Sequence, residues 1–419
     1  MPAERQRAAA LQSALVMSIR IGGAALQMLL VAVVALRFPV EVVGLNGIMW
    51  AVALVARAAG TFGLDTSGMR SQSPLWAEGR HDEARAIARR DARALLRIWA
   101  VLTVLALAAS LIVQLAGGAG GLVIVLYGVA VSSALGRLFM VQRVARQAPL
   151  AGQFLESVAL PGLALLIAIA SALLAPQLLI PGQVAAFVII SVAFWRLSPT
   201  AGPPPPASVT VPPVPWGQSL ILAAGSALTA LSVRGLMFLL GARSLAATGT
   251  YEVAQRIQSA GAMGTTAVAT VFMPRIAMSV TQRGRVVALV LEAAVVSAVL
   301  PTLLLGFLLV LGEHRIVDLL GPEYQGTWGA SVILVVATLI NALTSATSNV
   351  LMLGGRERLF LVISGAQLVL VVGGAWLLGT DSAVGMAWWM LIGELLRSCA
   401  MVTGFLVHLR GLGPRHRAD

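Results

Sequence analysis

Twelve apolar stretches, each about as long as a membrane-spanning helix, follow one another along the chain. A helix needs about 20 mostly apolar residues to cross the hydrocarbon core of a bilayer. The stretches run over 13–36, 42–68, 98–115, 121–141, 152–175, 182–197, 216–240, 246–273, 286–311, 326–352, 359–379 and 383–407. Of the 419 residues, 58% are hydrophobic and only 11% are charged, whereas soluble domains have about a quarter of their residues charged. We therefore predict an all-α polytopic membrane protein, with about 12 transmembrane helices in two six-helix bundles, and we exclude soluble enzyme folds.

The arginines outside these stretches predict how the chain is oriented. The N-terminus, every second loop and the C-terminal tail carry 20 arginines, whereas the opposite loops carry only Arg37, Arg243 and Arg315. Cytoplasmic loops are enriched in positive residues, so we predict that both termini are cytoplasmic. The net charge of +12 is explained by this orientation, and we expect no nucleic-acid partner.

A proline-rich segment divides the apolar stretches into two sets of six. Residues 198–215 contain a run of four prolines and three further prolines near their end. Such a sequence favours extended polyproline II structure and cannot form a packed core. We predict a first lobe over 1–197, a cytoplasmic linker over 198–215 and a second lobe over 216–419. The linker is expected to act as a semi-rigid tether, with a partner-binding site as the alternative.

The two halves show signs of an internal repeat. Gly44, Arg70, Gly79 and Arg80 recur at a constant offset of 205 as Gly249, Arg275, Gly284 and Arg285. Because each half has six stretches, the repeats would run parallel, related by an axis along the membrane normal. This is one of the two repeat arrangements found in secondary transporters, which bind substrate near the membrane midplane. We therefore expect a substrate cleft between the two lobes.

Six arginines lie inside the apolar stretches, where each costs about 2.5–3.5 kcal/mol unless it is paired or hydrated. They are Arg20, Arg57, Arg137, Arg234, Arg256 and Arg397. Glu252 precedes Arg256 by four residues and Glu394 precedes Arg397 by three, so each pair shares one helical face. We interpret both as local ion pairs. Arg137 lies near a helix end, from which its side chain can extend to the interface.

The remaining arginines suggest a site for an anion. Arg20, Arg57 and Arg234 have no acid three or four residues away. Together with Arg256 they lie on the first and second helices of each half, which could face a shared cleft. Guanidinium groups bind phosphate through paired hydrogen bonds. We predict that Arg20, Arg57, Arg234 and Arg256 bind an anionic, phosphorylated head group, with roles in packing or topology as the alternative.

The sequence gives little support for cation pumping, nucleotide binding, metal binding or catalysis. A cation pump would need carboxylates deep in the membrane, but Asp65, Glu156 and Glu292 fall toward the ends of the predicted helices. The chain has no lysine, which removes the phosphate-binding P-loop. Its single cysteine and four scattered histidines show no metal-ligand spacing. We expect no catalytic residues, no metal site, no cofactor and no enzymatic activity.

Several short motifs resemble one transporter family. The first half contains Gly44-Leu45, the run from Phe62 to Thr66, Arg70, and Glu78-Gly79-Arg80 followed by Glu83-Ala84. The second half contains Gly249-Thr250-Tyr251, Ala254-Gln255-Arg256, Met273-Pro274-Arg275 and the run from Leu320 to Tyr324. In their order and spacing these motifs resemble the polysaccharide flippases of the multidrug/oligosaccharidyl-lipid/polysaccharide exporter superfamily.

The resemblance implies a fold, a substrate and a set of partners. It implies two six-helix lobes around a central cavity, alternating access, and a bacterial cytoplasmic membrane. The implied substrate is a polyprenyl-diphosphate-linked oligosaccharide for capsule, O-antigen or exopolysaccharide synthesis, and the implied partners are membrane lipids, a polysaccharide polymerase and glycosyltransferases. Cavity arginines on the first, second and eighth helices of such flippases correspond to Arg20, Arg57 and Arg256, whereas Arg234 is added from its lack of a nearby acid.

Three other functions remain open from the sequence, one of them a non-transporting scaffold for the glycan assembly machinery. A drug/cation antiporter of the same superfamily would share the fold, but a positive cavity disfavours cationic drugs. A membrane-embedded glycosyltransferase or polymerase also has many helices and basic residues. Such an enzyme usually needs a sizeable outside loop and an acidic site, and the outside loops here are short.

Overall fold

A computed structural model describes residues 2–146, 149–201, 206, 209–279, 282–353 and 356–411. Within these residues, 11 helices are long and apolar enough to cross a membrane, and the chain is a multi-pass membrane protein. Six residues of the predicted linker, 202–205, 207 and 208, lie outside the described residues. The same holds for Arg415 and Arg417 of the predicted C-terminal tail.

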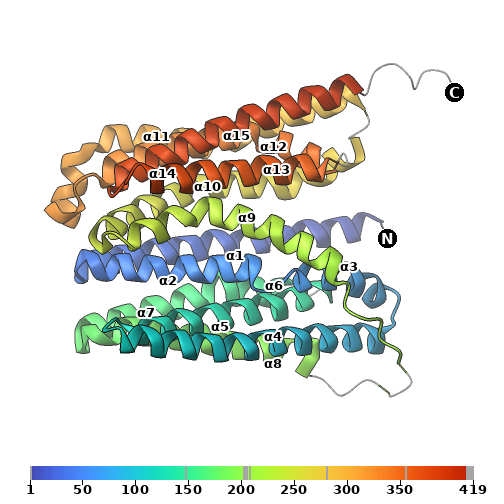
Figure 1. The fold of residues 1–419 in the computed structure, drawn as a ribbon. Helices are drawn as coiled ribbons and strands as arrows, with labels where there is room; N and C mark the ends of the chain where they lie inside the picture. The colour runs from blue at the N-terminus through green and yellow to red at the C-terminus, as the bar shows by residue number, and fades with distance from the viewer. Residues whose placement is uncertain are drawn as a thin grey trace. The chain divides into compact units, whose positions relative to one another are not determined.

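The chain forms two compact units, coloured along the sequence in Figure 1. The first comprises Met1–Phe38 and Met49–Ala230, and the second comprises Pro39–Ile48 and Leu231–Asp419. The first part of α2 (Val40–Ala59), up to Ile48, therefore belongs to the second unit. The first part of α9 (Trp216–Gly241), up to Ala230, belongs to the first unit.

The first unit is an all-helical bundle. Besides α2 and α9, its helices are α1 (Pro2–Arg37), α3 (Leu64–Ala77), α4 (His81–Leu115), α5 (Gly120–Ala145), α6 (Pro149–Phe154), α7 (Leu160–Leu174) and α8 (Leu179–Leu197). A π-helical turn, η1 (Leu155–Ala159), joins α6 to α7, and the short turns η2 (Pro176–Leu178) and η3 (Pro199–Ala201) flank α8. Helix α5 packs against α3, α4 and α8, while α1 packs against α6, η1 and α7.

The second unit is built in the same way. Its helices are α10 (Leu245–Ser279), α11 (Arg283–Leu320), α12 (Thr327–Leu353), α13 (Glu357–Leu368), α14 (Gly374–Leu377) and α15 (Ala383–Gly411), with the turns η4 (Pro322–Tyr324) and η5 (Val369–Gly373). Helix α12 packs against α10, α11, α13 and α15. Phe272, Val290, Val350 and Phe405 meet in its core, one from each of α10, α11, α12 and α15. Helix α11 bends at Gly312, whose φ of 72° lies in the left-handed region.

Large apolar side chains cover much of the outer surface of both units. Val104 on α4 is 66% exposed and Val310 on α11 is 81% exposed. Exposed apolar area of this extent would be unfavourable in water but is favourable against lipid chains. The exposed faces of α4 and α11 are therefore the surfaces that contact the bilayer.

Three predicted segments differ from the structure. The stretch 42–68 is not one helix, because α2 ends at Ala59 and α3 begins at Leu64 after Phe62 (φ 51°) and Gly63 (φ 75°) adopt left-handed conformations. The stretch 98–115 is the second part of the continuous 35-residue helix α4. The stretch 246–273 is part of the longer helix α10, whose 35 residues include Glu252, Arg256 and Arg275.

The internal repeat is visible in the contacts of α2 and α10. A Cβ at Gly44 would overlap the carbonyl oxygen of Leu245, and a Cβ at Gly249 would overlap the carbonyl oxygen of Val40. Val40 and Gly44 correspond to Leu245 and Gly249 at the offset of 205 found in the sequence. The two contacts are therefore reciprocal, and each glycine allows the other helix backbone to approach closely.

The π-helical turns support the same duplication. They occur in the fifth predicted apolar stretch of each half, η1 between α6 and α7 and η5 between α13 and α14. Single π-helical turns inside helices are rare and are frequently found at functional sites.

Candidate ligand-binding site

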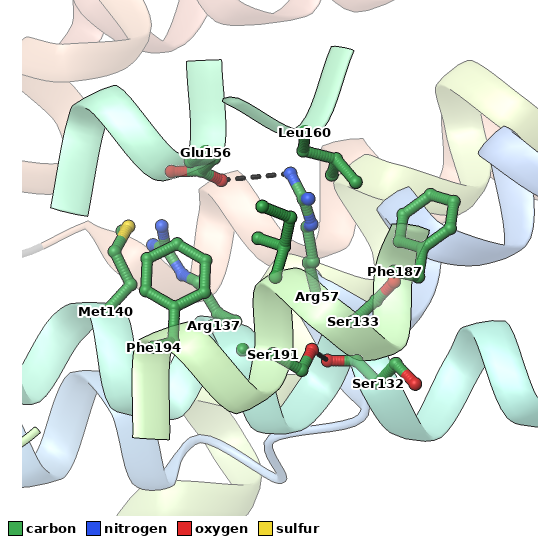
Figure 2. Close-up of a pocket in the computed structure, with 12 residues that line it drawn as sticks. Arg57, Ser132, Ser133, Arg137, Met140, Glu156, Leu160, Phe187, Ser191 and Phe194 are labelled. Carbon is green, nitrogen blue, oxygen red and sulfur yellow. Dashed lines mark hydrogen bonds and ion pairs between the residues drawn. The ribbon is translucent and has the colours of Figure 1, made fainter. Parts of the chain in front are cut away.

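The first unit contains a small pocket among its helices, lined mostly by apolar surface together with a few charged and hydroxyl side chains (Figure 2). Helices α2, α5 and α8 and the η1–α7 segment supply its walls. The lining residues are Arg57, Ser132, Ser133, Gly136, Arg137, Met140, Glu156, Leu160, Phe187, Ile190, Ser191 and Phe194. Its open space is about that of one water molecule, so a larger ligand requires the pocket to widen.

An ion pair lies in this pocket. The Nη1 of Arg57 donates to Oε1 of Glu156 at 3.0 Å, and both side chains are about one-fifth exposed (21% and 22%). The sequence shows no acid near Arg57, so we expected it to be unpaired, and the structure corrects this. The two residues are 99 positions apart, and a spacing of three or four residues along one helix cannot detect such a pair.

The π-helical turn η1 carries Glu156 into the pocket. The backbone N–H of Leu160 bonds to the carbonyl of Leu155, five residues earlier, instead of four as in an α-helix. Pro161 follows directly and has no N–H to continue the regular ladder at this point. None of the five η1 residues is fully buried. Glu156 therefore lies on an irregular, partly exposed turn, close to the start of the candidate membrane span Leu150–Leu174.

Arg137 lines the same pocket from α5. Its Nε lies 3.3 Å from Oδ2 of Asp65 at the start of α3, and its side chain is 36% exposed. Thr61 donates to the other carboxylate oxygen of Asp65 at 2.9 Å, which fixes this acid in place. The sequence identified Arg137 only as a residue near a helix end. The sequence analysis did not predict the break between α2 and α3, which places Asp65 where it can pair with Arg137.

Arg20 lies on α1 and contacts the same segment as Arg57. Its Nε donates to Oε1 of Gln153, on α6, at 3.1 Å. Helix α1 packs tightly here, because a Cβ at Gly23 would overlap the backbone of Ser157. The segment from Gln153 to Ser157 therefore contacts two of the predicted arginines, Arg20 through a neutral amide and Arg57 through a carboxylate.

The polar groups in this part of the first unit carry excess positive charge. Arg20, Arg57 and Arg137 face only two described acidic partners, Asp65 and Glu156. Electrostatic interactions are stronger in a medium of low dielectric constant than in water. The arrangement can therefore attract an anion, and its guanidinium groups present the donors that phosphate accepts.

The other two predicted arginines are buried in the second unit. Nε of Arg256 lies 2.6 Å from Oε1 of Glu252, as the sequence predicted, and Nη1 of Arg234 lies 3.5 Å from Oε2 of the same residue. Arg234 also donates to the side chain of Gln255. Both arginine side chains are less than one-tenth exposed, and Glu252 is fully buried. Arg234 therefore has an acidic partner, on a neighbouring helix.

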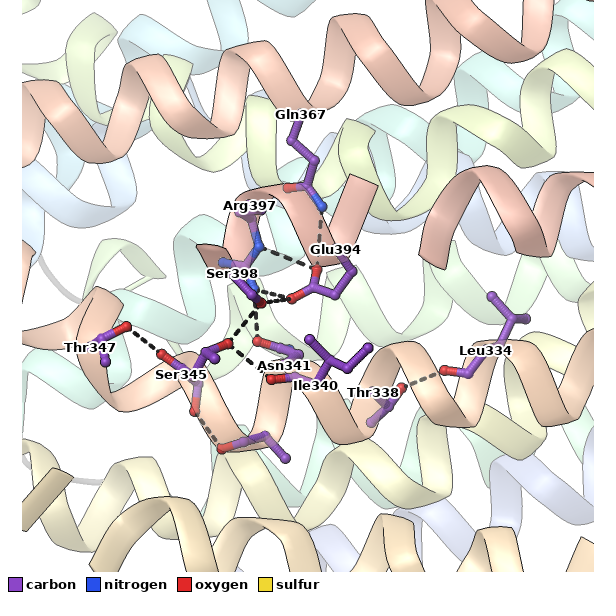
Figure 3. A network of polar contacts seen from close by, with 12 residues as sticks. Leu334, Thr338, Ile340, Asn341, Ser345, Thr347, Gln367, Glu394, Arg397 and Ser398 are labelled. Carbon is purple, nitrogen blue, oxygen red and sulfur yellow. Dashed lines mark hydrogen bonds and ion pairs between the residues drawn. The ribbon is translucent and has the colours of Figure 1, made fainter. Parts of the chain in front are cut away.

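A second polar network in this unit is centred on Glu394 (Figure 3). Its carboxylate accepts from Arg397, 2.5 Å away, and from the side-chain amide of Gln367 at 3.2 Å. Arg397 also donates to Oδ1 of Asn341 at 2.7 Å. The predicted ion pair is present, and α12 and α13 supply further partners. Because these charges are well satisfied, we assign this network to helix packing.

Metal-binding residues do not cluster in the part of the chain that the structure describes. No group of three or more histidine, cysteine, aspartate or glutamate side chains there could hold a metal ion.

Solved structures reveal the fold that this chain shares. No family model and no curated protein sequence matches the chain. A multidrug resistance MATE family transporter of the MOP superfamily, in an inward-facing conformation, is 16% identical with a TM-score of 0.68, over 96% of this chain and 98% of that one. The lipid II flippase MurJ, in an inward closed conformation, is 11% identical with a TM-score of 0.71, over 95% and 89%. A MOP superfamily transporter from Pyrococcus furiosus, described as having a binding pocket of reverse polarity, is 15% identical with a TM-score of 0.57, over 96% and 94%.

These likenesses establish that the chain has the fold of MOP superfamily transporters. The expected all-α, polytopic architecture is thereby confirmed.

Proposed function

We propose that this chain is a secondary transporter that flips a polyprenyl-diphosphate-linked oligosaccharide across a bacterial cytoplasmic membrane by alternating access. The product would enter the synthesis of capsule, O-antigen or exopolysaccharide, with a polymerase and glycosyltransferases as partners. The proposal places both termini in the cytoplasm, in line with the distribution of arginines.

The observation that carries this proposal is the excess of arginine in the first unit. Arg57 and Arg137 line one pocket, with Arg20 bonded to the neighbouring segment. A diphosphate carries at least two negative charges, and arginine binds phosphate oxygens through paired hydrogen bonds. We propose Arg57 as the principal phosphate ligand, with Arg20 beside it. Arg234 and Arg256 stay predicted ligands, and they would have to leave the buried pairs they form with Glu252 before they could bind substrate.

A drug/cation antiporter is the alternative within the same fold. MATE transporters and the lipid II flippase both resemble this chain, so the fold does not separate the two functions. The polar contacts favour the flippase, because Glu156, Glu252 and Glu394 are each paired with an arginine. A cationic drug would have to break an ion pair to bind any of these three carboxylates.

Reconstituted protein separates the two functions. Proteoliposomes containing the purified chain would be loaded with a fluorescent polyprenyl-diphosphate sugar, and membrane-impermeant reagents would measure its leaflet distribution. A parallel set would measure uptake of a cationic fluorescent drug. Protein-dependent movement of the lipid-linked sugar, without drug transport, is the expected result. Drug transport without movement of the sugar would overturn the proposal.

A further inference from the structure

Glu156 occupies the position at Arg57 that a phosphate oxygen would take. A carboxylate oxygen and a phosphate oxygen accept the same N–H donors of a guanidinium group. Within the described residues, Glu156 is the one hydrogen-bond partner of the Arg57 side chain. The pocket around the pair has room for about one water molecule. A phosphate group therefore cannot accept from Nη1 of Arg57 while Glu156 holds it.

We propose that Glu156 is a resident counter-ion of Arg57, which a phosphate-bearing ligand displaces when it binds. This inference rests on the proposed function and names the residue that controls access to its phosphate site. In the empty protein the carboxylate offsets the cost of an arginine within the membrane-spanning helices. On binding, the phosphate takes over this role, and the carboxylate turns away.

The surroundings of Glu156 allow this exchange. Its side chain is 22% exposed, and it lies on the π-helical turn η1, none of whose residues is fully buried. Figure 2 shows Glu156 and Arg57 pointing toward each other, with Arg137 in the same pocket. Arg137 has a single contact with a carboxylate, at 3.3 Å from Asp65, within the described residues. The pocket therefore contains a second positive charge, that of Arg137, with which the displaced carboxylate can interact.

Glu252 in the second unit is a counter-ion that cannot easily exchange with a ligand. It is fully buried, it contacts two arginines at once, and it lies on the regular helix α10. Moving Glu252 would remove the carboxylate that the buried Arg234 and Arg256 share, and breaking a buried ion pair has a high cost. Glu156 contacts one arginine and is partly exposed, so only Glu156 is suited to exchange with a ligand.

Binding of inorganic diphosphate to the purified full-length protein tests the proposal. Isothermal titration calorimetry would compare the wild type with Glu156→Gln, which removes the competing charge but keeps the size of the side chain. We expect Glu156→Gln to bind diphosphate about tenfold more tightly, which corresponds to about 1.4 kcal/mol. Glu156→Asp, which keeps the charge but shortens the side chain, should lie between the two. Glu292→Gln, on the exposed face of α11, should bind as the wild type does.

A structural role for Glu156 predicts the opposite result. If Glu156 only stabilised the fold, Glu156→Gln would bind diphosphate with equal or lower affinity. Equal or weaker binding by folded Glu156→Gln and Glu156→Asp proteins would overturn the proposal. If Glu156→Gln does not bind more tightly but Arg57→Ala abolishes binding, the counter-ion role of Glu156 is wrong while Arg57 is still supported as a phosphate ligand. Absence of binding in both the wild type and Glu156→Gln would overturn the phosphate site together with this inference.

A phosphate group can come from a glycan carrier or from an ordinary phospholipid. The same titrations with farnesyl diphosphate and with short-chain phosphatidylglycerol distinguish these sources. A gain in affinity confined to the prenyl diphosphate identifies the carrier as the ligand that displaces Glu156. A gain confined to phosphatidylglycerol also supports the counter-ion role of Glu156, but it contradicts the proposed flippase substrate.

Discussion

Arg57 on α2 and Glu156 on the π-helical turn η1 form an ion pair 3.0 Å long in the pocket of the first unit. The pair explains how an arginine can persist in an apolar helix, because its charge is balanced inside the bundle. It also leaves Arg57 about one-fifth exposed, which the buried arginines of the second unit are not. An anion can therefore reach Arg57 with a smaller rearrangement than Arg234 or Arg256 would need.

Glu252 should be required for the stability of the second unit. Removing it in Glu252→Ala leaves Arg234 and Arg256 buried without their shared partner, and breaking a buried pair costs about 3–5 kcal/mol. We expect a clear fall in the melting temperature of the detergent-solubilised protein, measured by intrinsic fluorescence. The control is Glu292→Ala, an exposed glutamate on α11, which should melt as the wild type does. An unchanged melting temperature for Glu252→Ala would contradict the buried contacts.

The reciprocal contact of α2 with α10 should tolerate no side chain at Gly44. A Cβ there would overlap the carbonyl oxygen of Leu245. Overpacking of this kind costs about 1–3 kcal/mol. Gly44→Ala and Gly249→Ala should therefore each lower the melting temperature. Gly306→Ala serves as the matched control, because a Cβ there meets no atom within 4 Å, and alanine favours a helix. Equal effects at Gly44 and Gly306 would argue against the close helix contact.

Arg90 should hold the end of the proline-rich linker against α4. Its Nη1 donates to the carbonyls of Pro212 at 2.6 Å and Pro213 at 3.1 Å, while its Nη2 pairs with the buried Asp91 at 2.7 Å. A spin label at Val211→Cys, in a Cys399→Ser background, should become more mobile when Arg90 is changed to alanine.

Arg85→Ala is the control for this measurement, because Arg85 pairs with Asp82 on its own helix. The contacts predict a sharper electron paramagnetic resonance spectrum for Arg90→Ala alone. Identical spectra for Arg90→Ala and the parent would show that these contacts do not restrain the linker.

Patterns confined to one helix were predicted well from the sequence. The pairs Glu252–Arg256 and Glu394–Arg397 follow from spacings of four and three residues, because such residues share a helical face. The apolar stretches likewise located the helices, because the bilayer fixes their length and composition.

Contacts between distant segments were not predicted. The pairs Arg57–Glu156 and Arg137–Asp65 join residues 99 and 72 positions apart, and only the packing of helices brings them together. The break at Phe62 and Gly63 was missed because the apolar run of α2 extends through Leu64, and the polar residues that open α3 follow only after it. The π-helical turn η1 has no distinctive composition of its own, so the position of Glu156 could not be read from the sequence.

Leaflet accessibility of a fluorescent polyprenyl-diphosphate sugar in proteoliposomes would measure whether flipping depends on Arg57. The comparison is between the wild type, Arg57→Ala and the control Arg97→Ala, an exposed arginine on α4. All three proteins would first be shown to be folded and inserted to the same extent. We expect the wild type and Arg97→Ala to flip the sugar, and Arg57→Ala to have lost this activity. Normal flipping by Arg57→Ala would contradict the role of Arg57 as the principal phosphate ligand.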